Sequence, residues 1–179
     1  MISQVAEFHD AFGVKRDYVD VELRYKLFKE EFEEYKDAKD LVERADAIVD
    51  MLYIACGTLD VHGWKMVKDN LYIGQLECNT LSLIKTYIET YRITKSKLSI
   101  INLIDEIITL AYINGIYDIL PELFNEVHAS NLSKLDENGK PIINDGILDT
   151  RKPIGKILKS ELFFEPKLKQ ILERYERIK

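Results

Sequence analysis

Glycine and proline are scarce in this chain of 179 residues, which has only 8 glycines and 4 prolines. Because both residues interrupt helices, their scarcity favours long helices. A basic excess is also lacking, since 25 Lys and Arg face 31 Asp and Glu, for a net charge of −6. This balance argues against a nucleic-acid partner, because phosphate backbones are bound by basic surfaces.

Long apolar runs and cysteine clusters are missing as well. No stretch approaches the ~18 uncharged apolar residues that a membrane span requires, and the first residues lack the basic and apolar regions of a signal peptide. Cys56 and Cys78 stand alone, without a CxxC or other ligand spacing, which indicates small buried side chains in a reducing compartment. We therefore expect a cytoplasmic protein with no membrane partner.

Histidine occurs only three times, and its placement excludes one class of metal site. A ferritin-like di-iron bundle uses Glu-x-x-His pairs on its helices. None of His9, His62 and His128 has a glutamate three positions before it. A di-iron centre of this type is therefore set aside.

The remaining composition, 46% hydrophobic and 31% charged, predicts one globular domain over residues 1–179. We expect an all-α bundle of four long helices built from two related hairpins, followed by a flap and a C-terminal helix. The predicted parts are a short helix over 2–12, a first helix pair over 20–62, a second pair over 71–119, a helix and flap over 121–160, and a helix over 166–178.

Acidic residues fall on faces of the first helix pair that should be dry. On a helical wheel of the first helix, Glu31 lies inside the apolar stripe and Glu34 lies at its edge. The second helix is apolar nearly all round from residue 45 to residue 61, which is typical of a buried helix. Its acids, Glu43, Asp46 and Asp50, share one face.

Buried unpaired carboxylates cost several kcal/mol each, so they protonate or bind a cation. Arg44 is the only Lys or Arg between Asp40 and Trp64, so nearby side chains cannot neutralise the cluster. A hard divalent cation with oxygen ligands, such as Mg²⁺, is the simplest partner. The alternative interpretation is that the run from Glu30 to Glu34 is a solvated charged face, but the paired spacing and the second acidic face favour the metal.

The second predicted helix pair resembles the first one in sequence. A shift of 59 residues places Asp105 on Asp46 and Tyr112 on Tyr53, while the Glu31/Glu34 pair has no counterpart. We interpret this as a degenerate internal repeat that kept the packing and lost the acids.

At these acidic residues the chain resembles a known superfamily. Glu30-Glu31-Phe-Glu-Glu34 is similar to the EExxE motif, and Glu43-Arg-Ala-Asp46 to the ExxD motif, of the all-α (MazG-like) nucleoside triphosphate pyrophosphohydrolases, which include the dimeric dUTPases and phosphoribosyl-ATP pyrophosphohydrolase. The segments 7–13, 127–135 and 138–141 resemble a MazG-like subgroup. The interval of eight residues between Glu34 and Glu43 is short for the family, so Glu43/Asp46 and Asp46/Asp50 both stay open as the second acidic pair.

The resemblance implies hydrolysis of a nucleoside triphosphate to its monophosphate and pyrophosphate, with Mg²⁺ or a substituting Mn²⁺, by a homodimer. It implies metal ligands at Glu31, Glu34, Glu43, Asp46 and Asp50, and a general base at Glu30 or Glu34. It implies substrate contacts from Asn131, Lys134 and the flap lysines Lys140, Lys156 and Lys159, with Gln4 and Phe8 near the base. The alternative interpretation, which the helical spacing favours, is that Phe8 is a core residue.

A second class of function remains possible from the sequence. A non-catalytic helical module that binds a partner protein would tolerate the acids if they were exposed or paired with lysines. Titration with Mg²⁺ separates the two hypotheses, because such a module should have no metal site.

Overall fold

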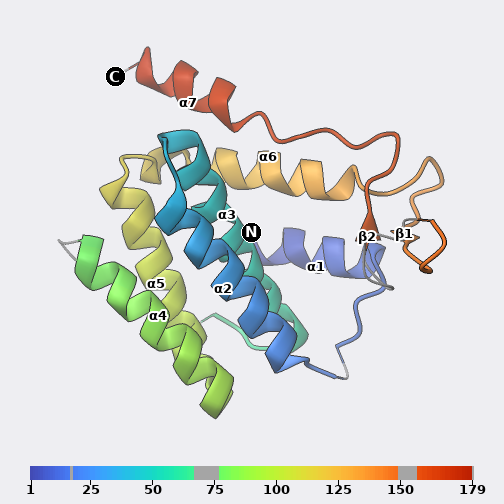
Figure 1. Cartoon of the computed structure of the whole chain (residues 1–179), viewed down its shortest axis with the longest axis horizontal. Helices are drawn as coiled ribbons and strands as arrows, with labels where there is room; N and C mark the ends of the chain where they lie inside the picture. The colour runs from blue at the N-terminus through green and yellow to red at the C-terminus, as the bar shows by residue number, and fades with distance from the viewer. Residues whose placement is uncertain (17, 67–76, 149–156, 179) are drawn as a thin grey trace.

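The computed structural model describes residues 1–16, 18–66, 77–148 and 157–178, and these parts are almost entirely helical (Figure 1). The helices are α1 (Ile2–Ala11), α2 (Val21–Asp37), α3 (Leu41–Val61), α4 (Glu77–Thr94), α5 (Lys97–Ile113), the short 3-10 helix η1 (Tyr117–Ile119), α6 (Leu120–Leu132) and α7 (Leu168–Glu176). In the described residues the only sheet pairs β1 (Ile142–Ile143) with β2 (Ile157–Leu158). The predicted all-α class is confirmed.

The ends of the first hairpin follow from local chemistry. Asp20 and Asp40 are the N-caps of α2 and α3, and their carboxylates accept hydrogen bonds from the backbone N–H groups of Leu23 and Glu43, both at 2.9 Å. Each cap satisfies an N–H group that has no partner inside the helix. Beyond the end of α3, Gly63 has φ +63°, a left-handed conformation that glycine adopts without strain.

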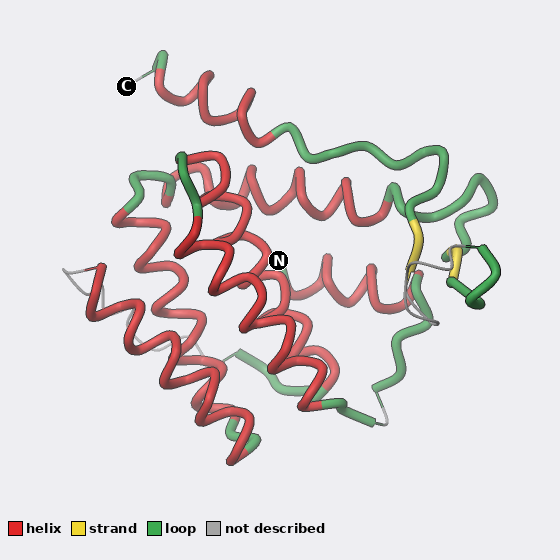
Figure 2. The backbone as a smooth tube through the Cα atoms, viewed as in Figure 1, coloured by secondary structure: helices red, strands yellow, loops and turns green. Residues whose placement is uncertain are grey.

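Two antiparallel hairpins form the bundle. Hairpin α2–α3 lies beside hairpin α4–α5, with α2 packed on α4 and α3 packed on α5 (Figure 2). Helix α3 lies at the centre and is buried on nearly every side, as its almost continuous apolar sequence predicts. The acids of α3 are therefore carried by the most enclosed helix of the fold.

Three further helices cover the side of α3 that the bundle leaves open. Both α1 and α6 pack on α3 and on each other, and α7 packs on α3 and α6 (Figure 1). Aromatic rings join these layers: Tyr53 of α3 stacks on Phe124 of α6 at 5.3 Å and meets Phe8 of α1 edge-on at 5.8 Å. The end of α6 is thereby fixed next to the acidic face of α3.

Some helix boundaries differ from those predicted. Helix α5 ends at Ile113 rather than at residue 119, because Gly115 adopts φ +70° and the side chain of Asn114 binds the carbonyl of Leu110 at 2.8 Å. Helix α6 then begins at Leu120 and ends at Leu132, three residues earlier than expected. The predicted start of the second hairpin, at residues 71–76, lies outside the described residues.

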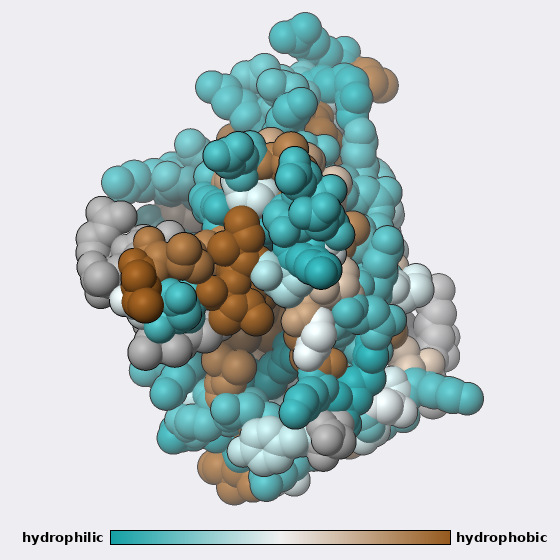
Figure 3. All heavy atoms as spheres, turned by 90° about the vertical axis from the view of Figure 1, so that its right-hand side faces the viewer, coloured by the Kyte–Doolittle hydropathy of each residue, from teal (hydrophilic) through white to brown (hydrophobic). Residues whose placement is uncertain are grey.

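The predicted flap contains the small sheet. Ile142 pairs with Leu158 and Ile143 with Ile157, in antiparallel register, while residues 149–156 lie outside the described part. The exposed apolar side chains in this region include Ile143, Ile147 and Leu148. β1 lies at the end of the molecule that faces the viewer in Figure 3, where apolar side chains gather.

In the described ranges, no single helix is long and apolar enough to cross a membrane. Helix α5 and the following segment Tyr117–Leu132 together reach the length and apolar composition of a membrane span, but the two are bent by 117° relative to each other.

Candidate active site

A cavity of about 270 Å³ opens between α1, α2, α3 and the end of α6. Four elements that are far apart in the sequence thus converge on one space. Its lining residues are Val5, Phe8, His9, Arg24, Leu27, Glu31, Asp50, Tyr53, Ile54, Asn131 and Lys134. The cavity therefore joins predicted metal ligands, predicted substrate contacts and two residues, His9 and Arg24, that were not predicted as site residues.

Two carboxylates enter this cavity from the facing helices of the first hairpin. Burial and, after it, the charge of Asp50 raise the pKa of Glu31 to about 8. Burial likewise raises the pKa of Asp50 to about 7, with a contribution from Asp46. In the described part of the chain, no hydrogen bond offsets either rise. At neutral pH the pair is thus held in an environment that disfavours its negative charge.

The acidic group extends beyond these two residues. Glu34 raises the pKa of Glu31, and burial followed by the charges of Glu34 and Glu165 raises the pKa of Asp46. Glu165 lies in the segment before α7, and no sequence pattern connected it with the acids of α3. The structure thus gathers acids from α2, α3 and the C-terminal segment.

Glu43 has a different environment. Its carboxylate accepts a hydrogen bond from the backbone N–H of Lys39 at 2.7 Å, while its own N–H donates to Asp40. This is a reciprocal cap of the start of α3. Glu43 is not among the charges that shift Glu31, Asp46 or Asp50. Of the two pairs left open by the sequence, Asp46/Asp50 is the one that joins the buried acids. Glu30 is exposed, and its charge contributes to the raised pKa of Glu31.

A metal site is not formed by the side chains in their present positions. In the part of the chain that the structure describes, no group of three or more His, Cys, Asp and Glu side chains converges closely enough to hold an ion. The donor set nevertheless fits a hard divalent cation, because it consists of carboxylate oxygens only. The raised pKa values of Glu31 and Asp50 show that these buried acids are short of positive charge.

Positive charge comes from the end of α6. The ammonium of Lys134 donates to Asn131 Oδ1 at 2.6 Å, and its charge lowers the pKa of Asp50. The Asn131 amide also contacts Tyr53, whose hydroxyl lies 3.0 Å from His128 Nδ1. Asn131 and Lys134 therefore lie next to each other beside the acids, and Asn131 contacts Tyr53.

Of the other predicted substrate-contact residues that the structure describes, only Phe8 lines the cavity. Gln4 donates to Asn125 at 2.9 Å and is not a lining residue. Lys159 pairs with a glutamate at 2.8 Å and lies over an aromatic ring, while Lys140 is exposed. Neither lysine lines the cavity, and Lys156 lies outside the described residues.

Arg24 is the charged lining residue that was not expected from the sequence, whereas His9 follows Phe8 on the segment expected near the base. His9 is 3% exposed, although a single histidine of this kind is more often found on the surface. The missed signal for Arg24 is its position on the same helical stripe as Leu27 and Glu31, at i, i+3 and i+7.

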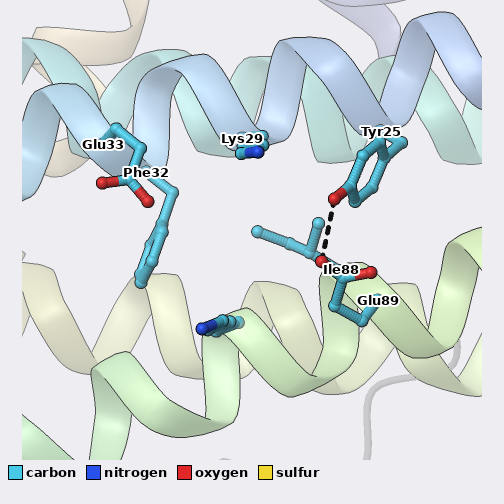
Figure 4. A pocket seen from close by; sticks show the side chains of 7 residues that line it. Tyr25, Lys29, Phe32, Glu33, Ile88 and Glu89 are labelled. Atoms are coloured by element: carbon cyan, nitrogen blue, oxygen red, sulfur yellow. Dashed lines mark hydrogen bonds between the residues drawn. The ribbon is translucent and has the colours of Figure 1, made fainter.

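A smaller cavity, of about 40 Å³, lies between α2 and α4 (Figure 4). Tyr25 of α2 donates to Glu89 of α4 at 2.8 Å across it. This space is far below the several hundred Å³ of a typical small-molecule site. It is a packing gap between the two hairpins.

Comparison with known proteins matches the part of the chain that forms most of the larger cavity. No curated protein and no solved structure matches the chain significantly. Residues 5–68 match the sequence model of the family described as Phosphoribosyl-ATP pyrophosphohydrolase. The matched segment contains most of α1 and all of α2 and α3, and hence Glu31 and Asp50. It supports a pyrophosphohydrolase activity on a nucleotide phosphoanhydride. Because that family is part of the MazG-like superfamily of all-α nucleoside triphosphate pyrophosphohydrolases, the resemblance predicted from the acidic motifs is confirmed.

Proposed function

We propose that this protein is a Mg²⁺-dependent nucleoside triphosphate pyrophosphohydrolase that releases the monophosphate and pyrophosphate. The observation that carries the proposal is the pair Glu31 and Asp50, two partly buried acids that line one cavity and whose pKa values are both raised, with Lys134 as the neighbouring cation that partly offsets Asp50. They lie on the segment that matches the pyrophosphohydrolase family. Lys134 and Asn131, on the same cavity, supply donors for an anionic substrate.

The metal would be held by Glu31, Glu34, Asp46 and Asp50. Glu43 stays a predicted ligand from the motif, but it would have to leave its hydrogen bond with the N–H of Lys39. A bound Mg²⁺ would neutralise phosphate charge and lower the pKa of a water ligand. Mn²⁺ is expected to substitute, because it accepts the same oxygen donors.

The residues of the chain would position and deprotonate the attacking water. The water oxygen bonds to the α-phosphorus, the bond from that phosphorus to the oxygen bridging it to the β-phosphorus breaks, and that oxygen leaves with the pyrophosphate. Glu34 or Glu30 accepts the proton of the water; both are exposed at the edge of the acidic group. Lys134 offsets the charge of the phosphates as a point charge.

The products test this reaction directly. A purified sample with Mg²⁺ is incubated with a panel of nucleoside triphosphates, their deoxy forms and phosphoribosyl-ATP, and the released phosphate species are separated. We expect monophosphate and pyrophosphate, with no diphosphate intermediate. Release of single phosphates would contradict the proposed bond, and turnover of phosphoribosyl-ATP alone would narrow the substrate to that of the matched family.

The alternative function is a helical module that binds a partner protein. It predicts that the acids have no metal affinity and that no nucleotide is hydrolysed. Isothermal titration with Mg²⁺ and Mn²⁺ distinguishes the two, using Asp50→Asn as the variant that should lose the signal.

Assembly and location remain proposals as well. We infer a homodimer from the resemblance to dimeric members of the superfamily, and a cytoplasmic location from the isolated cysteines. Sedimentation equilibrium tests the dimer, and a mass corresponding to one chain over the micromolar range would contradict it.

A further inference from the structure

In the described residues, Arg24 lines the cavity without a direct ion pair, although the charges of Asp60 and Asp20 act on it at longer range. It lies on the cavity-facing side of α2 and is largely removed from water, which lowers the pKa of its guanidinium. In the described residues, its one hydrogen-bond partner is the ring of His9, with Arg24 Nη2 at 3.4 Å from His9 Nε2. A guanidinium has five N–H donors. Within the described residues, most of these donors are therefore open to a group that enters this cavity or the neighbouring one of about 210 Å³, which Arg24 also lines.

His9 faces Arg24 as an acceptor because of what lies behind it. Asp60 Oδ2 lies 2.7 Å from His9 Nδ1 and also accepts a hydrogen bond from Arg16 Nε at 2.9 Å. A carboxylate only accepts, so the proton of the neutral imidazole lies on Nδ1 and the lone pair of Nε2 faces Arg24. Burial and the nearby Arg24 and Arg16 lower the pKa of His9 despite Asp60, which favours this neutral form.

The backbone of α3 makes room for this pair. A Cβ atom at Gly57 would lie 3.1 Å from Arg24 Nη1 and 3.1 Å from His9 Cε1. These distances are shorter than ordinary contacts. Glycine in the middle of a helix costs about 1 kcal/mol relative to alanine, and here it permits the close approach of both side chains.

The two ends of the cavity differ in chemistry. Glu31 and Asp50 form one end, and Arg24 lies two helical turns before Glu31 on α2, about 10 Å along the helix axis. The lining also includes the apolar side chains of Leu27 and Ile54 and the ring of Phe8. Apolar and aromatic walls together with a set of donors suit a flat heterocycle whose edge carries acceptors.

We propose, building on the pyrophosphohydrolase function above, that Arg24 selects the base of the nucleotide by donating hydrogen bonds to a ring carbonyl. The substrate class is then nucleotides with an oxo group where adenine and cytosine carry an amino group. An exocyclic amino group at that position would place its N–H donors against those of the guanidinium. Asp60 and His9 are positioning residues that hold Arg24 in place.

Two matched substrate pairs test the proposal. Inosine and adenosine triphosphates differ at position 6 of the purine, as oxo against amino, and uridine and cytidine triphosphates differ in the same way at position 4 of the pyrimidine. We expect the wild type to prefer the oxo member of at least one pair by about tenfold or more in kcat/KM. The preference should lie mainly in KM, because the base is remote from the bond that breaks.

Arg24→Met keeps length and removes the donors, and it should abolish the preference by raising KM for the oxo nucleotide only. Arg24→Lys, with a single point charge, should restore part of it. If Arg24→Met impairs folding, the preference is measured instead as wild-type binding of inosine against adenosine monophosphate. Equal kcat/KM for both members of both pairs in the wild type would overturn the proposal that Arg24 selects the base. An equal loss of kcat/KM for all nucleotides in Arg24→Met would overturn it too, because it would indicate that Arg24 binds the phosphates.

Failure of the proposed function looks different, because no triphosphate would then be cleaved by the wild type at all.

The positioning role of Asp60 is tested with a matched pair of variants, since Asp10 and Asp60 both bind Arg16 but only Asp60 contacts His9. In Asp60→Asn, the amide can donate to Nδ1 and move the ring proton to Nε2, where it opposes Arg24. We expect Asp60→Asn to reduce the oxo preference and Asp10→Asn to retain it; equal behaviour of the two would exclude the positioning role.

Discussion

Glu31 of α2 and Asp50 of α3 line the same cavity from facing helices, and the charge of Asp50 adds to the burial that raises the pKa of Glu31. Neither acid is neutralised by a hydrogen bond in the described residues. The fold therefore holds two like charges together at a cost in stability. That cost determines how the protein should respond to pH, to metal and to substitution.

The first prediction concerns pH without metal. The pKa of Glu31 rises from 4.5 to about 8 and that of Asp50 from 3.8 to about 7 on folding. The folded state therefore binds these two protons more tightly than the unfolded state does. The resulting stabilisation is fully present below pH 4 and is lost as the pH rises to 8. After allowance for the partial exposure of Glu31, we expect a loss on the order of 1–3 kcal/mol between pH 5 and pH 8.

Chemical denaturation in the presence of a chelator measures this loss. Glu31→Gln should flatten the pH dependence, because the amide does not ionise. Glu33→Gln is the control, since Glu33 is exposed and paired with Lys36 at 2.6 Å. An unchanged slope in Glu31→Gln would mean that Glu31 ionises normally in the folded protein.

The second prediction decides between the two possible acidic pairs on α3. Mg²⁺ should raise the melting temperature of the wild type, because a ligand that binds only the folded state stabilises it. Asp50→Asn should abolish this rise. Glu43→Gln should keep it but unfold more easily by about 1 kcal/mol, because it weakens the cap of α3. The reverse pattern would assign Glu43 to the metal.

The third prediction compares two lysines. Lys134 lines the cavity and offsets Asp50, whereas Lys159 pairs with Glu165. We expect Lys134→Ala to lower kcat/KM by about tenfold or more, with less than about 1 kcal/mol of stability lost. Lys159→Ala should leave steady-state kinetics nearly unchanged. Equal losses in both variants would indicate a general field effect rather than a local contact.

The fourth prediction concerns Gly57. Alanine in a helix interior normally stabilises it by up to about 1 kcal/mol relative to glycine. Here the new Cβ would meet Arg24 and His9 at 3.1 Å, so one of these side chains must move. We expect a stability change near zero together with a higher KM. A more stable protein with unaltered KM would show that the position of the guanidinium does not matter.

The sequence predicted those parts of the structure that depend on local chemistry. The first helix pair, predicted over 20–62, begins after the N-cap Asp20 and ends at Val61, and the place of Glu31 inside an apolar stripe indicated its partial burial. The early end of α5 was marked by Asn114 and Gly115, a turn signal that the apolar pattern obscured.

Long-range proximity could not be predicted in the same way. Glu165 reaches the acids of α3 only through the path of the chain after β2, and no periodicity encodes such a contact. Arg24 shares the stripe of Glu31, but its role depends on His9 and Asp60, which come from two other helices. Residue pattern fixes the face of a helix, and tertiary packing decides what that face meets.

The two hairpins of the bundle can be aligned in sequence but differ in charge, and of the aligned pair Tyr53 and Tyr112 only Tyr53 is buried. At the positions of α4 and α5 that correspond to Glu31, Glu34 and Asp50 after the shift of 59 residues, the chain has Thr90, Ile93 and Thr109. Glu89 and Asp105 retain acids at the positions of Glu30 and Asp46. We therefore expect only the first hairpin to bind the nucleotide, so nucleotide titrations should saturate at one molecule per chain.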